Sequence, residues 1–204
     1  MNDVMKALAF FGAFNPPTVA HIQLAEFALR QTGGRERVIF VPSKAAYIKD
    51  EQGKDFAYTD GQRLSMLQKA AEARPWMAVT GWEMEQPRQP RTYETLCHLR
   101  AEGIQAALLL GSDKLPELEH GWLHVEEIAR EFGIVCLSRG GDECARMIQE
   151  NDFLRSLAPY ITVLDTPEAT KGVSSTAVRR RVAEMKRLQS EIAAMVPGEI
   201  MAML

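Results

Sequence analysis

A short stretch near the amino terminus combines residue types that bind phosphate. Gly12 ends an apolar run, and Thr18 and His21 follow where a segment of helical periodicity begins. The first amides of a helix lack intrahelical partners and lie at the positive end of its dipole, so a glycine-containing turn leading into a helix can bind an anion. We expect His21 to donate a hydrogen bond to the same phosphate. The alternative is a helix start in which this histidine only caps or packs.

A second candidate phosphate site lies near the carboxyl terminus. Ser174, Ser175 and Thr176 precede a helix predicted to run to about Gln189, and Arg179 lies one turn into it. Hydroxyl and amide donors at a helix start, together with a guanidinium, suit the β- and γ-phosphates of a nucleotide. The alternative is a capped helix with a solvated basic face.

The hydrophobic pattern indicates the fold that must position these two segments. Six short apolar runs alternate with longer segments whose apolar residues recur every three or four positions. The runs that predict strands are Ala7–Gly12, Arg37–Ser43, Met77–Met84, Gln105–Gly111, Gly133–Arg139 and Tyr160–Asp165. The unbroken aliphatic sequence Ala106–Leu110 is typical of a parallel strand that is covered on both faces. We therefore predict an α/β fold, a doubly wound and mostly parallel sheet with helices on both faces and ligands at the carboxyl ends of its strands.

Composition restricts the classes of protein to which the chain can belong. It has 204 residues, 46% hydrophobic and 25% charged, with a formal net charge of −3. These values predict one domain over 1–204 and no general attraction for nucleic acid. The candidate phosphate-binding helix at about 173–189 belongs to this same domain. Three cysteines without C-x-x-C spacing favour a reducing cytoplasm over a disulfide framework or a zinc site. No apolar run is long enough to predict a membrane anchor, and Ala45–Thr59 is predicted to be a mobile loop.

The fingerprints of dinucleotide-binding dehydrogenases and of P-loop kinases, G-x-G-x-x-G and G-x-x-x-x-G-K-[ST], do not occur in the sequence. Instead, residues 12–21 (G-A-F-N-P-P-T-V-A-H) resemble the first signature of a nucleotidyltransferase superfamily, [HT]-x-G-H. Thr18 stands at the position of its first histidine and Ala20 at that of its glycine. Residues 173–179 (V-S-S-T-A-V-R) are similar to the second signature of the superfamily, [IV]-S-S-T-x-x-R.

This resemblance implies a Rossmann-like fold and a set of phosphate-binding residues. It implies that His21 and Thr18 contact the triphosphate of ATP, with His21 nearest to the α-phosphate, and that Arg179 holds the departing pyrophosphate. The other residues implied to bind the phosphates are Gly12, Phe14, Asn15, Ser174, Ser175 and Thr176. Mg²⁺ is the implied bridging ion, and since the sequence has no dense carboxylate cluster, we expect substrate oxygens and water to be its main ligands.

Further segments resemble the nicotinate (nicotinamide) mononucleotide adenylyltransferases, which act in NAD synthesis. Residues 42–49 are similar in spacing to a loop of these enzymes, which implies a phosphate role for its retained cation, Lys49. Residues 91–96 (R-T-Y-E-T-L) resemble their pyridine-recognition element and imply that Thr92 contacts the pyridine ring, although Arg91 stands where the family often has an aromatic residue. The alternative for Thr92 is a helix N-cap.

Two more resemblances involve the segment after the fourth predicted strand. Residues 111–115 (G-S-D-K-L) are similar to the family pattern G-[ATS]-D-x-[LMV], which implies that Gly111 and Asp113 contact the nucleotide. The alternative for Asp113 is an N-cap. Trp122 is implied to flank the nicotinate ring, the alternative being a loop aromatic that packs on the core. Residues 62–67 resemble a helix of the family that we expect to be structural.

The resemblance implies transfer of AMP from ATP to nicotinate mononucleotide, or to nicotinamide mononucleotide, with release of pyrophosphate. Because the attacking phosphate is already anionic, the protein has to align the reactants and stabilise charge. Two alternatives stay open: transfer to another phosphorylated acceptor, such as phosphopantetheine or glycerol phosphate, and a nucleotide-binding regulator without catalysis. The sequence also leaves open which pyridine base is preferred and whether the chain forms a homo-oligomer.

Overall fold

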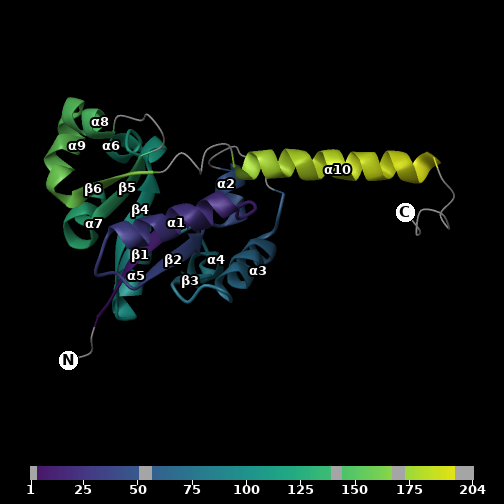
Figure 1. The fold of residues 1–204 in the computed structure, drawn as a ribbon. Helices are drawn as coiled ribbons and strands as arrows, with labels where there is room; N and C mark the ends of the chain where they lie inside the picture. Colours follow the sequence, from purple (N-terminus) through teal and green to yellow (C-terminus); the bar gives the residue numbers. More distant parts are fainter. Residues whose placement is uncertain (1–3, 51–56, 139–143, 167–172, 196–204) are drawn as a thin grey trace.

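The computed structural model describes residues 4–50, 57–138, 144–166 and 173–195. Its strands are β1 (Met5–Gly12), β2 (Arg37–Pro42), β3 (Met77–Val79), β4 (Ile104–Gly111), β5 (Ile134–Ser138) and β6 (Ile161–Asp165). Its helices are α1 (Val19–Gln31), α2 (Ala45–Asp50), α3 (Asp60–Ala71), α4 (Trp82–Glu85), α5 (Thr92–Ala101), α6 (Leu118–Gly121), α7 (Val125–Phe132), α8 (Cys144–Glu150), α9 (Asp152–Leu157) and α10 (Ser175–Met195) (Figure 1).

The six strands form one sheet in the order β3-β2-β1-β4-β5-β6, and each neighbouring pair is parallel. β1 is central, with Phe10 opposite Phe40 of β2 on one side and Leu109 of β4 on the other. The chain therefore runs outward from β1 in one direction and then, from β4 onward, in the other. This reversal creates a crevice beyond the carboxyl ends of β1 and β4, where doubly wound sheets bind ligands.

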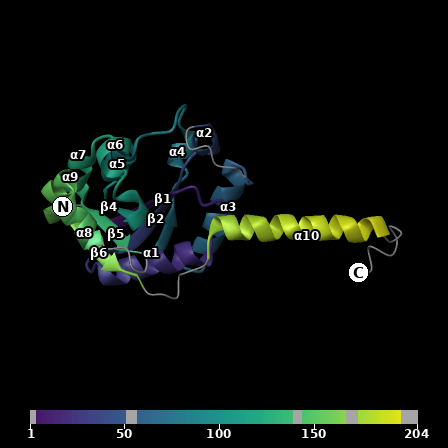
Figure 2. The same ribbon diagram turned by 90° about the horizontal axis from the view of Figure 1, so that it is seen from above.

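Helices cover both faces of the sheet, as the apolar strands require (Figures 1 and 2). Alternate strand residues point to opposite faces, so Leu8 and Phe10 pack with α1 and α3, whereas Ala7 and Ala9 lie in a second cluster with α5, α7, α8 and α9. The predicted Rossmann-like α/β fold is confirmed. None of the helices in the described part of the chain is both long and apolar enough to cross a bilayer.

Two predictions of local structure are wrong. The run Met77–Met84 forms a strand only at β3, because the chain turns at Gly81 and residues 82–85 form α4. The first part of the predicted mobile loop Ala45–Thr59 is helix α2, which Ile48 anchors through a side chain that is 2% exposed. Residues 51–56 lie outside the described residues.

Helix α10 starts at the sheet and then extends away from it (Figures 1 and 2). Ser174 caps it, because its hydroxyl accepts a hydrogen bond from the amide of Ala177 at 3.1 Å. The helix ends at Met195, about two turns beyond the predicted end, and Met185 and Leu188 are exposed on its outer part. Only the first turns of α10 are thus placed next to the rest of the molecule.

Candidate active site

A cleft of about 550 Å³ opens at the carboxyl ends of β1, β2 and β4. Of the residues predicted to form a site, those that line it are Gly12, Phe14, His21, Thr92, Gly111, Asp113 and Trp122. They come from the β1–α1 turn, the start of α5 and the segment after β4. These three regions are distant in the sequence, and the order of the strands in the sheet brings their residues together around one cleft.

Thr18 and His21 form a reciprocal pair at the start of α1. The backbone N–H of Thr18 donates to Nδ1 of His21 at 3.0 Å, and the Thr18 hydroxyl lies 2.8 Å from the same nitrogen. Because Nδ1 accepts the backbone hydrogen, the proton of the neutral imidazole is on Nε2, which makes Nε2 the donor of the ring. The histidine therefore caps the helix and lines the cleft at the same time, so the two interpretations of His21 do not exclude each other.

An aromatic side chain packs against the imidazole of His21. The ring of Phe14, only 2% exposed, meets that of His21 nearly edge to face, with centroids 5.2 Å apart. A Cβ atom at Gly12 would lie 3.1 Å from this phenyl ring. Glycine at the end of β1 thus permits the close approach of Phe14, whose ring in turn holds the imidazole of His21 in position.

The two phosphate-binding candidates meet in space although some 160 residues separate them. Nη1 of Arg179 donates to the carbonyl oxygen of Asn15 at 2.8 Å, and the hydroxyl of Ser175 donates to that of Pro16 at 2.7 Å. The start of α10 is therefore bound to the β1–α1 turn. A second Arg179 nitrogen, Nη2, donates to the hydroxyl of Thr176 at 3.2 Å. Two helix N-termini and a guanidinium consequently lie around one turn.

Arg63 is a residue that the sequence analysis assigned only to a structural helix. Its side chain is fully buried and joins the turns that follow β1 and β2, donating to the carbonyl of Ala13 at 2.5 Å and to that of Ser43 at 2.6 Å. An ion pair with Asp60 at 2.6 Å balances its charge. Burial lowers the pKa of Arg63, and the Asp60 carboxylate opposes that shift. This arginine thus holds in place Ala13 and Ser43, two residues that line the cleft.

Seven of the predicted phosphate contacts do not line the cleft: Thr18, Asn15, Lys49, Ser174, Ser175, Thr176 and Arg179. The buried side chain of Asn15 accepts hydrogen bonds from the amides of Ala57 and Tyr58, at 3.3 and 3.2 Å, and so holds the chain leading into α3. Lys49 is exposed on α2, whereas its neighbour Ile48 faces the cleft.

The far side of the cleft carries the two predicted pyridine-binding residues, Thr92 and Trp122, and Asp113, which is predicted to contact ATP. Thr92 is the first residue of α5, and since Arg91 occupies the N-cap position, the N-cap interpretation of Thr92 is wrong. Asp113 is exposed in a short 3₁₀ turn after β4. Trp122 is half-buried, lines the cleft and packs against the main core cluster, so its predicted ring-flanking position and the packing alternative are both compatible with its location.

A buried carboxylic acid in the cleft wall was missed by the sequence analysis. Glu83 of α4 is 1% exposed, and its two carboxylate oxygens accept hydrogen bonds from Thr95 at 2.7 Å and from Gln89 at 2.5 Å. Burial raises the pKa of Glu83 to about 7, although both hydrogen bonds act in the opposite direction. The available signal was an acidic residue inside an apolar run that had been predicted to be a strand.

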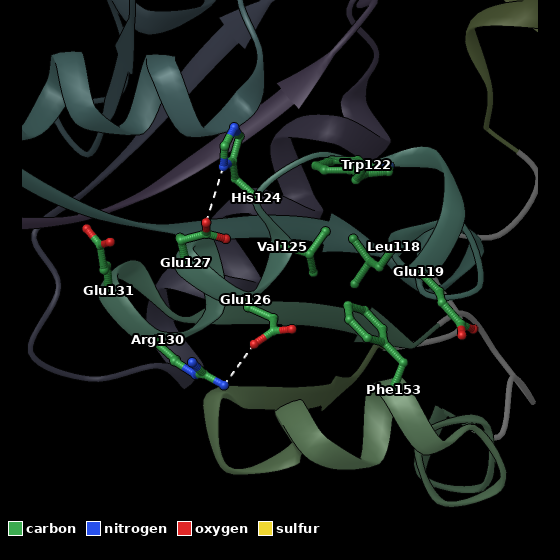
Figure 3. A pocket seen from close by; sticks show the side chains of 10 residues that line it. All are labelled: Leu118, Glu119, Trp122, His124, Val125, Glu126, Glu127, Arg130, Glu131 and Phe153. Carbon is green, nitrogen blue, oxygen red and sulfur yellow. Dashed lines mark hydrogen bonds and ion pairs between the residues drawn. The ribbon is translucent and has the colours of Figure 1, made fainter.

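A second hollow of about 650 Å³, which shares Trp122 with the cleft, lies beside α7 (Figure 3). Four glutamates, one arginine and one histidine line it together with apolar side chains. Arg130 pairs with Glu126 at 2.8 Å, and His124 with Glu127 at 3.3 Å. None of the predicted site residues except Trp122 borders this hollow.

The fold and the paired phosphate signatures define a nucleotidyltransferase, and comparison with known families agrees. The family model described as Cytidylyltransferase-like matches residues 9–181, and the chain belongs to this family. The matched range contains both signature segments and, apart from the first four residues of β1, the whole sheet.

Individual relatives narrow the comparison within that family. A probable nicotinate-nucleotide adenylyltransferase of Salinibacter ruber is 30% identical over 182 residues, which are 87% of this chain and 91% of that protein. A probable enzyme of the same name from Caldicellulosiruptor bescii is 26% identical over 185 residues, covering 91% and 90% of the two chains. The structure of Plasmodium falciparum nicotinic acid mononucleotide adenylyltransferase complexed with APC has the same fold, with a TM-score of 0.65, 14% identity and coverage of 86% and 83%.

Proposed function

We infer that this protein transfers AMP from ATP to nicotinate mononucleotide and releases pyrophosphate, the reaction of a nicotinate-nucleotide adenylyltransferase. The full-length similarity to proteins of that name supports the reaction class. The observation that carries it in the structure is the contact between the two signature segments, in which Arg179 and Ser175 donate to the carbonyls of Asn15 and Pro16 in the turn that leads to His21.

The phosphates of ATP bind, in this proposal, around the β1–α1 turn. Nε2–H of His21 donates to a non-bridging oxygen of the α-phosphate, and Thr18 keeps the ring in the required tautomer. The N-terminus of α10, with Ser174 and Thr176, and the guanidinium of Arg179 stabilise the negative charge of the pyrophosphate as it leaves. Asn15 contributes by holding the turn through its buried amide.

The acceptor binds on the opposite wall of the cleft. Thr92 contacts its pyridine ring and Trp122 flanks this ring, whereas Gly111 and Asp113 contact ATP, Asp113 through the ribose hydroxyls. An oxygen of the mononucleotide phosphate then attacks the α-phosphorus in line with the bond to the bridging oxygen of pyrophosphate. One P–O bond forms and one breaks, and both reacting groups are already ionised, so alignment and charge stabilisation account for the catalysis.

Mg²⁺ fits this cleft as an ion that the substrate carries. The described residues contain no group of three or more His, Cys, Asp or Glu side chains that could hold a metal. Asp113 lines the cleft and could supply one carboxylate oxygen, so phosphate oxygens and water would complete the octahedron that Mg²⁺ prefers. When bound, the ion would neutralise phosphate charge.

The test is pyrophosphate release from MgATP, with nicotinate mononucleotide and nicotinamide mononucleotide offered in parallel and the product identified by mass. We expect the dinucleotide product and the higher kcat/KM with nicotinate mononucleotide. If neither acceptor gave pyrophosphate release but ATP raised the melting temperature, the protein would use another acceptor or bind nucleotide without catalysis. That result would contradict the proposal.

A further inference from the structure

Glu83 is a buried acid to which the proposed reaction gives no role. Among the residues that the structure describes, it is the one carboxylic acid whose side chain is buried, and it also borders the cleft. A carboxylate removed from water is costly unless hydrogen bonds compensate it. Its two partners, Thr95 and Gln89, are neutral donors, one to each oxygen. Such an arrangement costs stability that an apolar side chain at this position would not cost, so a role in the site can account for it.

Gln89 connects this acid to the turn after β2. While its amide nitrogen donates to Glu83, its amide oxygen accepts a hydrogen bond from the backbone N–H of Lys44 at 2.8 Å. The same amide nitrogen also lies 3.3 Å from the carbonyl of Pro90. Every polar atom of the Gln89 side chain is therefore used to connect the cleft wall to its surroundings.

Lys44 closes the network from the other side. Its ammonium donates to the carbonyls of Met84 at 2.7 Å and Gln86 at 2.5 Å, which follow Glu83 in the chain. The segment between α4 and α5 is thus bound at both ends to the β2–α2 turn. This segment continues directly into Pro90, Arg91 and Thr92, which line the cleft.

We propose that Glu83 is a positioning residue for the acceptor: by holding Gln89 and Thr95, it fixes the segment from Pro90 to Thr92 in the conformation that binds the pyridine mononucleotide. The inference rests on the proposed function, which assigns Thr92 to the pyridine ring. Thr95 lies one helical turn after Thr92 on α5, so its bond to Glu83 sets the rotation of the helix that presents Thr92. The binding of ATP phosphates at the β1–α1 turn does not depend on these bonds.

The test replaces Glu83 by glutamine in the full-length protein. Glutamine fills the same volume, but one of its terminal atoms is an amide donor, so it cannot accept from both Gln89 and Thr95. We expect the KM for nicotinate mononucleotide to rise roughly tenfold, the effect of losing one such bond, while the KM for ATP stays unchanged. Glu85→Gln, on the exposed face of the same helix, is the matched control and should leave both KM values as in the wild type.

A second variant separates positioning from general destabilisation. Gln89→Met retains the length of the side chain but removes its hydrogen bonds to Glu83, Lys44 and Pro90, and it should raise the same KM. Because the two residues act through one contact, the double variant should show no further rise beyond the larger single effect. If Glu83→Gln does not fold, judged by its melting curve, Gln89→Met alone decides, and an unchanged acceptor KM would overturn the proposal.

The remaining outcomes are equally decisive. Equal rises in the KM for ATP and for the mononucleotide, or additive effects in the double variant, would mean that Glu83 only stabilises the fold. An inactive wild-type protein would overturn the proposed function, and this inference with it. An active wild type with an unaltered Glu83→Gln variant would overturn the role of Glu83 alone.

Discussion

The cleft at the strand ends and the hollow beside α7 are similar in size, about 550 and 650 Å³, but their polar side chains are held differently. In the hollow, Arg130 and Glu126 are both more than half exposed and form an ion pair within one helix (Figure 3). Glu83 in the cleft wall and Arg63 behind the cleft are buried and bind partners from other elements. Exposed ion pairs of this kind contribute little to stability, and their side chains can change conformation, whereas the buried side chains are held in one conformation.

This difference shows why volume alone does not locate the site. A binding site needs polar groups whose positions are fixed before the ligand arrives. Strand ends supply such positions, because the sheet holds the turns that follow β1, β2 and β4 next to one another. Variants in the two regions should therefore have very different effects.

Replacement of Arg63 is expected to have the largest effect. Arg63→Met leaves the carbonyls of Ala13 and Ser43 without the guanidinium and the Asp60 charge without its partner, so unfolding should become easier by about 3–5 kcal/mol. Urea denaturation measures this change. Arg30→Met, which breaks an ion pair of an arginine that is 74% exposed, is the control and should shift stability by less than about 0.5 kcal/mol. Similar values for the two variants would contradict the role assigned to the buried arginine.

The two histidines that line these regions allow a matched comparison of activity. His21→Asn retains an oxygen that can accept from the Thr18 amide but has no atom in the place of Nε2, so kcat should fall roughly a hundredfold, about 3 kcal/mol. His124→Asn in the hollow is the control, because asparagine tolerates the positive φ of 61° found there. Its turnover should equal that of the wild type. Comparable turnover in both variants would remove His21 from the proposed mechanism.

The sequence predicted those parts of the cleft that depend on local spacing. Thr18 and His21 are three residues apart, which is the separation of a capping pair, and Ala106–Leu110 is apolar throughout because β4 is covered on both faces. Ser174 likewise acts as the predicted cap of the last helix. Each of these features follows from the period of one helix or one strand.

Contacts between distant segments could not be read from that spacing. Because hydrophobic alternation continues past Val79, the strand was predicted too long. The alternation also cannot reveal that Glu83 accepts a hydrogen bond from Thr95 on α5. In the same way, Arg63 is part of a helix expected to be structural, and only the fold shows that its guanidinium reaches the turns after two strands.

The pH dependence of stability provides a further test of the buried acid. The folded protein retains the proton of Glu83 up to about pH 7, whereas the unfolded chain releases it near the ordinary pKa of 4.5. Between these values the folded state binds more protons, so this group lowers the free energy of unfolding as pH rises, by about 3 kcal/mol in total. Urea denaturation across this range, for the wild type and for Glu83→Gln, isolates the contribution. Parallel pH profiles of the two proteins would show that Glu83 ionises as freely as an exposed carboxylate.

The smallest effects are expected from surface ion pairs, where the same Glu→Gln substitution can be made in the cleft and in the hollow. Glu126→Gln breaks the pair with Arg130 in the hollow and should change neither kcat/KM value. Glu117→Gln breaks the pair with Lys114 on the cleft wall, where removal of one negative charge should improve the KM of the anionic substrates roughly twofold. Initial rates at low ionic strength make the difference largest, because salt screens both charges. A tenfold loss of kcat/KM in Glu126→Gln would instead indicate that the hollow is part of the active site, because an exposed ion pair that does not contact a substrate should not affect activity this strongly.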